Sequence, residues 1–175
     1  MSYGQFILAL DGRILHHGTE AARVTALCLD TLTANAELPV LAMLRLSHEQ
    51  LRGTRGATAS VVRFDYACNG LIWSGIGDVV ALLFRSDGTA VAERETLLSR
   101  PGVLGSGSPT LIASQVDIRR GDLLVLATDG IGRDFERSVD RGAQPQVVAE
   151  RILADHSKRT DDALVLVARY RGLRA

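Results

Sequence analysis

A buried strand that ends in an acidic turn constrains the fold of this chain most strongly. Residues 123–127 form the apolar run Leu-Leu-Val-Leu-Ala, which is typical of a strand buried on both faces. Asp129 and Gly130 follow, after Thr128. An acidic side chain at a strand end suits a hard metal such as Mg²⁺ or Mn²⁺, and glycine lets the backbone come close. Because Asp-Gly is also common in hairpin turns, this stretch alone leaves both interpretations open.

A second acidic segment lies near the C-terminus. Asp161 and Asp162 stand side by side immediately before the apolar run of residues 163–168. Adjacent carboxylates repel each other unless a cation or hydrogen-bond donors compensate their charge, and a divalent metal would do so. The alternative is an acidic loop between a helix and a strand. If the two apolar strands are neighbours in one sheet, Asp129 and Asp161 lie at the same end, within reach of one ion.

Length and charge narrow the class of protein. The 175 residues fit a single domain, residues 1–175, that is large enough to bury a core. Twenty basic residues balance twenty acidic ones, so no basic field predicts binding to nucleic acid or to a membrane surface. Neither a membrane-spanning apolar run nor a signal peptide is present, and the two cysteines form no disulfide or zinc pattern. We therefore expect a cytoplasmic protein.

The order of elements predicts an α+β fold. Apolar residues recur at helical spacing early and late in the chain, and between them the pattern changes to the alternation of strands. Because helices and strands do not alternate along the chain, antiparallel sheets with helices outside suit it better than a doubly wound sheet. We expect helices at 19–34, 39–51 and 145–156, strands at 6–10, 57–64, 71–74, 79–85 and 90–95, a hairpin of strands 111–118 and 123–128, and a final strand after the acidic pair.

Five short motifs follow one another along the chain, at residues 17–22, 51–59, 75–78, 128–130 and 161–162. Taken in order, they resemble motifs of the metal-dependent (type 2C) Ser/Thr protein phosphatases. The similarity is greatest to the SpoIIE-type bacterial branch and, within it, to the RsbX-like phosphatases of stress signalling. It extends from about Ile7 to Arg169, nearly the whole chain. Each motif is short, and only their joint order makes the resemblance specific.

The resemblance implies both a fold and a metal site. The fold is a sandwich of two antiparallel sheets flanked by helices (αββα layers), here shortened at the N-terminus. Two Mn²⁺ or Mg²⁺ ions are expected at one end, where a bridging water attacks phosphorus in line. By position, Asp129 and Asp161 would bind one ion, and Asp11 would bridge both, with the carbonyl of Gly12 as a further ligand. Asp162 stands where the family has a supporting residue more often than a ligand.

The implied activity is dephosphorylation of regulatory phosphoproteins. The resemblance points to phosphorylated partners of the anti-anti-sigma or stressosome type, built on a STAS domain. The alternative is a phosphatase-fold binding module in signalling that has little or no catalytic activity. The sequence names neither the individual partner nor the physiological metal nor the oligomeric state.

Two departures from the family pattern concern the first metal motif. Asp11 lies two residues too far from Gly18, and Arg13 stands where strict spacing would place the metal-binding aspartate. Either two residues are inserted between Asp11 and His17, or the ligand is lost and Asp11-Gly12 is only a turn. The family also carries a further acidic ligand on earlier strands, for which this chain offers no candidate. Either the second metal binds weakly or the sequence begins too late.

Overall fold

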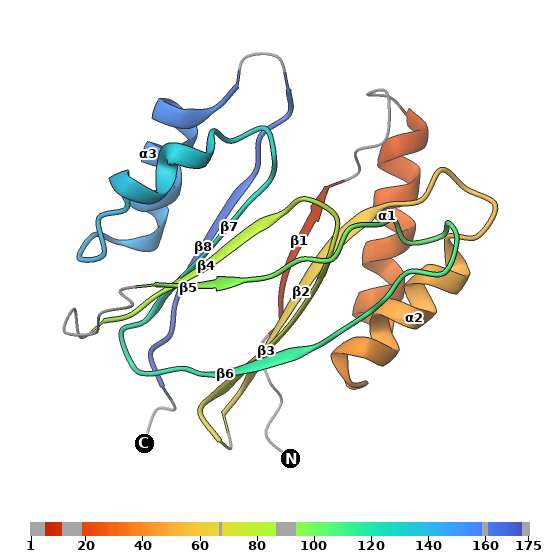
Figure 1. Cartoon of the computed structure of the whole chain (residues 1–175), viewed down its shortest axis with the longest axis horizontal. Coiled ribbons are helices and arrows are strands. Elements are labelled where there is room, and N and C mark those ends of the chain that lie inside the picture. The colour runs from red at the N-terminus through yellow and green to blue at the C-terminus, as the bar shows by residue number, and fades with distance from the viewer. Residues whose placement is uncertain (1–5, 12–18, 67, 87–93, 159–160, 173–175) are drawn as a thin grey trace. The chain divides into compact units, whose positions relative to one another are not determined.

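A computed structural model of the chain describes residues 6–11, 19–66, 68–86, 94–158 and 161–172 (Figure 1). The chain divides into two compact units, each with its own sheet. Unit 1 comprises residues 1–79 and 98–116, and unit 2 comprises residues 80–97 and 117–175. Asp11, in the segment that resembles the first metal motif, belongs to unit 1. Asp129, Asp161 and Asp162, in the segments that resemble the last two, belong to unit 2.

Unit 1 consists of a four-stranded sheet and two helices. Its strands have the order β1-β2-β3-β6, with antiparallel pairing of β1 with β2 and of β2 with β3. Helix α1 buries Val24, Cys28 and Leu32, which recur every four residues and so lie on one face. This face packs in one apolar cluster with residues of α2, β2 and β3. The elements are β1 (Phe6–Asp11), α1 (Thr19–Ala34), α2 (Val40–Gln50), β2 (Thr58–Asp65), β3 (Gly70–Ile76) and β6 (Ser114–Asp117).

Unit 2 consists of a second four-stranded sheet, a short 3₁₀ helix and one α-helix. Its strands have the order β5-β4-β7-β8, and every neighbouring pair is antiparallel. Phe135 of η1 and Val148 and Ile152 of α3 pack in one apolar cluster with residues of β4 and β7. The elements are β4 (Val80–Phe84), β5 (Arg94–Leu97), β7 (Leu123–Ala127), η1 (Arg133–Ser138), α3 (Pro145–His156) and β8 (Val165–Arg169).

Strand β7 is buried at every residue, as its apolar run predicts. It has β4 on one side and β8 on the other, so it lies in the interior of its sheet. Strand β8 is only half-buried, because it lies at the end of the strand order. The apolar run after the acidic pair is therefore a strand, as expected, and it is half-buried.

The predicted hairpin of residues 111–118 and 123–128 is also wrong. Strand β6 pairs with β3 in the first sheet, whereas β7 pairs with β4 and β8 in the second. The sequence of β6 is short and polar, and most of its residues are exposed, which suits the edge of a sheet. The wholly apolar β7 suits an interior strand of the second sheet, with β4 on one side and β8 on the other. The strand expected at 90–95 begins at Arg94, and residues 87–93 lie outside the described part of the chain.

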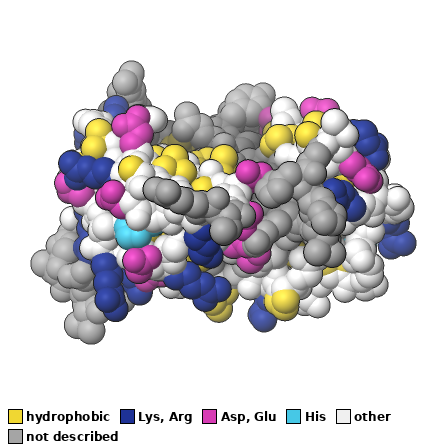
Figure 2. All heavy atoms as spheres, turned by 90° about the horizontal axis from the view of Figure 1, so that it is seen from above, with side chains coloured by type: hydrophobic (Ala, Val, Ile, Leu, Met, Phe, Trp, Pro, Cys, Tyr) yellow, Lys and Arg dark blue, Asp and Glu magenta, His cyan; other side chains and the backbone are white. Residues whose placement is uncertain are grey.

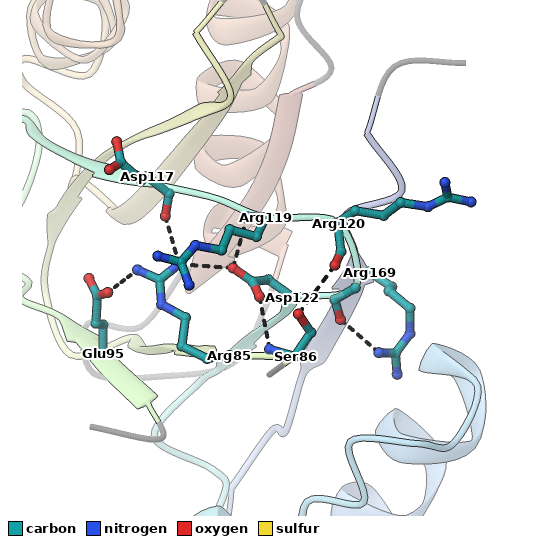
Figure 3. A network of polar contacts seen from close by, with 9 residues as sticks. Arg85, Ser86, Glu95, Asp117, Arg119, Arg120, Asp122 and Arg169 are labelled. Carbon is teal, nitrogen blue, oxygen red and sulfur yellow. Dashed lines mark hydrogen bonds and ion pairs between the residues drawn. The ribbon is translucent and has the colours of Figure 1, made fainter. Parts of the chain in front are cut away.

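A buried polar network fixes the end of β7 from which the chain enters the sheet (Figure 3). Asp122 is fully buried and accepts hydrogen bonds from the Arg85 guanidinium at 2.8 Å, the Ser86 backbone at 2.9 Å and the Arg119 backbone at 3.0 Å. Arg85 also forms an ion pair with Glu95 of β5. A buried carboxylate is tolerated only when it is paired and hydrogen-bonded in this way. The network ties β4, β5 and the start of β7 together.

Two antiparallel sheets with flanking helices confirm the predicted fold class. Among the described residues, no helix is long and apolar enough to cross a membrane. Basic and acidic side chains are interspersed over the described part of the face in Figure 2, in keeping with the zero formal charge.

Candidate functional site

The strand register of unit 2 brings its two acidic segments to the same end of the sheet. Ala127, the last residue of β7, is paired with Val165, the first residue of β8. Asp129 leaves β7 two residues later, and Asp161 and Asp162 precede β8. The Thr128 backbone N–H donates to the Leu164 carbonyl, and the Leu164 N–H donates to the Thr128 hydroxyl, both at 3.0 Å. These bonds continue the pairing beyond the strands, toward the carboxylates.

Gly130 lies directly against the backbone of the second acidic segment. A Cβ atom at this position would lie 2.0 Å from the carbonyl oxygen of Asp162 and 2.7 Å from its carbonyl carbon. Real Cβ atoms do not approach backbone atoms so closely, so a side chain would force the two segments apart. The absence of a side chain at Gly130 therefore allows the Asp129 and Asp162 segments to touch.

Lys158 binds both acidic segments, although the sequence did not single it out. Its ammonium donates to the backbone carbonyl of Asp129 at 2.6 Å, and its backbone N–H donates to the carbonyl of Gly130 at 2.7 Å. Its own carbonyl accepts from the backbone N–H of Asp161 at 3.2 Å. The only signal in the sequence is a basic residue placed three positions before the acidic pair.

His156 joins the end of α3 to η1, beside these segments. One ring nitrogen lies 2.7 Å from the Ser138 hydroxyl, and the other lies 3.2 Å from an Asp134 carboxylate oxygen. The Ser138 hydroxyl also lies 2.8 Å from the Phe135 carbonyl, to which it donates. The backbone N–H of Gly132 donates to the His156 carbonyl at 2.8 Å. These contacts fix the path of the chain immediately after Gly130.

In unit 1, Asp11 is the last residue of β1 and is paired in register with Thr58, the first residue of β2. Gly77, just after β3, has φ +108°, and a Cβ there would lie 2.4 Å from the Cβ of Thr58. Asp11, in the segment that resembles the first metal motif, and Gly77, in the motif of residues 75–78, thus lie at the same end of the first sheet, on either side of Thr58. Gly12 and His17 lie outside the described residues, so the choice between an insertion and a lost ligand stays open.

The donors at the acidic end of unit 2 suit a divalent metal. Carboxylate oxygens are the ligands that Mg²⁺ and Mn²⁺ prefer. Asp129 and Asp161 are half-buried, Asp162 is exposed, and the Asp162 N–H donates to an Asp161 carboxylate oxygen at 3.0 Å. Within the described part of the chain, no group of three or more His, Cys, Asp or Glu side chains could hold a metal. The acidic segments of unit 2 offer carboxylate oxygens of the kind that such metals prefer.

Solved structures similar to this chain include type 2C phosphatase domains. One similar structure is described as belonging to the bacterial stressosome, a modular system adapted to control secondary messenger signalling. It matches with a TM-score of 0.83 and 26% identity, over 97% of this chain and 86% of the other. RsbX in complex with magnesium matches with a TM-score of 0.75 and 19% identity over 95% and 86% of the two chains. The type 2C phosphatase domain of SpoIIE from Bacillus subtilis matches with a TM-score of 0.69 and 14% identity, over 97% and 58%.

The sequence itself decides the family. No curated protein sequence matches the chain. The family of stage II sporulation protein E, SpoIIE, matches residues 15–171, which is most of the chain. The chain therefore belongs to the SpoIIE family.

Proposed function

We propose that this protein is a metal-dependent Ser/Thr protein phosphatase that removes phosphate from a regulatory phosphoprotein. The observation that carries the proposal is the meeting of the Asp129 and Asp161–Asp162 segments at one end of the second sheet, in a chain of the SpoIIE family. Both segments belong to motifs that this family uses for metal binding. The whole chain, residues 1–175, would act as one phosphatase domain.

Each carboxylate would have its own role in binding Mn²⁺ or Mg²⁺. Asp129 and Asp161 would bind one of the two ions, and Asp162 would support them. By the family resemblance, Asp11 would also hold the ions, and the Gly12 carbonyl would be a further ligand. When bound, the ions lower the pKa of the attacking water and neutralise charge on the phosphoryl group.

The chain's own residues prepare the carboxylates before a metal enters. The Thr128–Leu164 hydrogen bonds and the close approach at Gly130 fix the distance between the two acidic segments. Ligands that are already in place lose less conformational entropy on binding than ligands on loose loops do. The site is therefore built on strand ends, whose positions the sheet sets, and this favours productive geometry.

The proposed partner is a phosphorylated STAS-domain protein of the anti-anti-sigma or stressosome type, in the cytoplasm. Support comes from the similar structures, one described under the bacterial stressosome and one of RsbX. The formal net charge of zero gives no overall basic field that would favour nucleic acid or an anionic membrane as the partner.

The test is phosphate release from a purified, phosphorylated STAS-domain protein, followed by mass spectrometry with and without Mn²⁺. We expect loss of the phosphoryl mass only with Mn²⁺, together with binding of Mn²⁺ in a calorimetric titration. If the chain binds the phosphoprotein but does not bind Mn²⁺ at millimolar concentration and does not remove the phosphoryl group, it is instead a binding module without catalysis.

A further inference from the structure

We infer that Lys158 is a positioning residue of the metal site, and that its ammonium fixes the orientation in which Asp129 presents its carboxylate. This inference rests on the proposed function, because it concerns the same site. The ammonium lies 2.6 Å from the Asp129 backbone carbonyl, a short, charge-assisted hydrogen bond to the residue expected to bind the metal.

Lys158 contacts both acidic segments through its own backbone and side chain. Its backbone N–H donates to Gly130, and its backbone carbonyl accepts from Asp161. These two bonds need no particular side chain, so they remain when Lys158 is replaced. The bond to the Asp129 carbonyl is the one contact among the three that depends on the ammonium, and a substitution removes it alone.

The ammonium acts on the metal through Asp129. The Asp129 carbonyl accepts from the Lys158 ammonium, and the Gly130 carbonyl accepts from the Lys158 backbone N–H, so Lys158 binds two consecutive peptide groups. Holding both carbonyls restricts rotation of the turn from which the Asp129 side chain leaves. Because Lys158 is exposed, its bond should contribute little to the stability of the whole chain.

A simple charge effect and a positioning role of Lys158 predict opposite changes in Mn²⁺ affinity when the ammonium is removed. A positive charge beside the site repels a divalent cation, so its removal would tighten metal binding. If the ammonium instead positions Asp129, its removal loosens the turn and weakens metal binding. The direction of the change in Mn²⁺ affinity therefore separates the two effects.

The experiment is a calorimetric Mn²⁺ titration of the full chain and of Lys158→Met and Lys158→Arg, with thermal unfolding of each in EDTA. The control is Arg151→Met, which removes an exposed cation of α3 that lies 3.5 Å from Asp140. We expect Lys158→Met to weaken Mn²⁺ binding roughly tenfold, the scale of one lost hydrogen bond to a charged group. Lys158→Arg should restore most of the affinity, and Arg151→Met should leave it unchanged.

Unchanged or tighter Mn²⁺ binding by Lys158→Met would overturn this inference and leave the proposed function standing. A lower melting temperature of Lys158→Met in EDTA would also overturn it, because the lysine would then stabilise the fold in general. Failure of the unsubstituted chain to bind Mn²⁺ would overturn the proposed function and this inference with it.

Discussion

At the scale of single residues, Gly130 is the position where the site tolerates least change. Gly130→Ala would place a methyl group 2.0 Å from the Asp162 carbonyl oxygen, so the acidic segments must separate. Overpacking of this kind costs about 1–3 kcal/mol, and the separation should also weaken Mn²⁺ binding. Thermal unfolding and a Mn²⁺ titration measure the two effects.

The matched control for Gly130→Ala is Gly142→Ala. A Cβ at the exposed Gly142 would meet its nearest atom, an Asp140 carboxylate oxygen, at 3.4 Å, which is ordinary contact. We expect this variant to keep its Mn²⁺ affinity. Equal affinities in both variants would show that the close approach at Gly130 is unimportant for the site.

The two cysteines should differ sharply in reactivity. Burial raises the pKa of the Cys28 thiol from 9.0 to about 11, against a smaller lowering by Ser47, whereas Cys68 is exposed. At about pH 8 the raised pKa keeps Cys28 in its protonated thiol form, which is unreactive because the nucleophile is the thiolate. Iodoacetamide should therefore label Cys68 and spare Cys28 in the folded chain, as read by peptide mass spectrometry. Equal labelling of both would contradict the buried packing of α1.

At the scale of elements, the Asp122 network should stabilise unit 2 more than any exposed ion pair. Asp122→Ala leaves the largely buried Arg85 without this partner and removes the acceptor of two backbone N–H groups. Breaking a buried pair costs about 3–5 kcal/mol. Urea unfolding should show this loss, whereas Asp140→Ala, which breaks the exposed pair with Arg151, should cost about 0–1 kcal/mol. Similar losses in both variants would contradict the proposed role of the network.

Helices were the most predictable elements. The expected helices at 19–34, 39–51 and 145–156 agree with α1, α2 and α3 to within one residue, because their apolar spacing and, for α2 and α3, a proline at the start are local signals. The pairing of β7 was not predictable in the same way. Residues 111–118 and 123–128 are close in sequence, but β6 and β7 lie in different sheets, and their partners come from distant parts of the chain.

The candidate site was predictable only in part, for a similar reason. Asp129 and Asp161 could be placed at one end of a sheet because each adjoins an apolar strand. Lys158 could not be found, because its contact with Asp129 exists only once two separate turns meet. The ligand roles of Asp11, Gly12, Asp129, Asp161 and Asp162 stay predictions.

At the scale of the whole molecule, metal should stabilise the folded chain. Mn²⁺ at about a hundred times its dissociation constant would add about 2.7 kcal/mol, which corresponds to a melting temperature roughly 5–10 °C higher. Asp129→Asn or Asp161→Asn should remove this gain. Asp117→Asn should retain it, since Asp117 ends β6 and binds Arg85 through its backbone carbonyl. Asp87 lies outside the described residues, and Asp87→Asn should behave in the same way. Loss of the metal response in the Asp117 variant would argue against a specific site.

The central claim is that this chain hydrolyses phosphomonoesters with a metal held by Asp129. The most direct measurement is hydrolysis of p-nitrophenyl phosphate by the purified chain with Mn²⁺, with excess EDTA, and by Asp129→Asn with Mn²⁺. We predict hydrolysis with Mn²⁺, none with EDTA, and a loss of more than about a hundredfold in the variant, because even residues that only support metal ligands are worth ten- to a hundredfold. Hydrolysis that survives both EDTA and Asp129→Asn would contradict the claim.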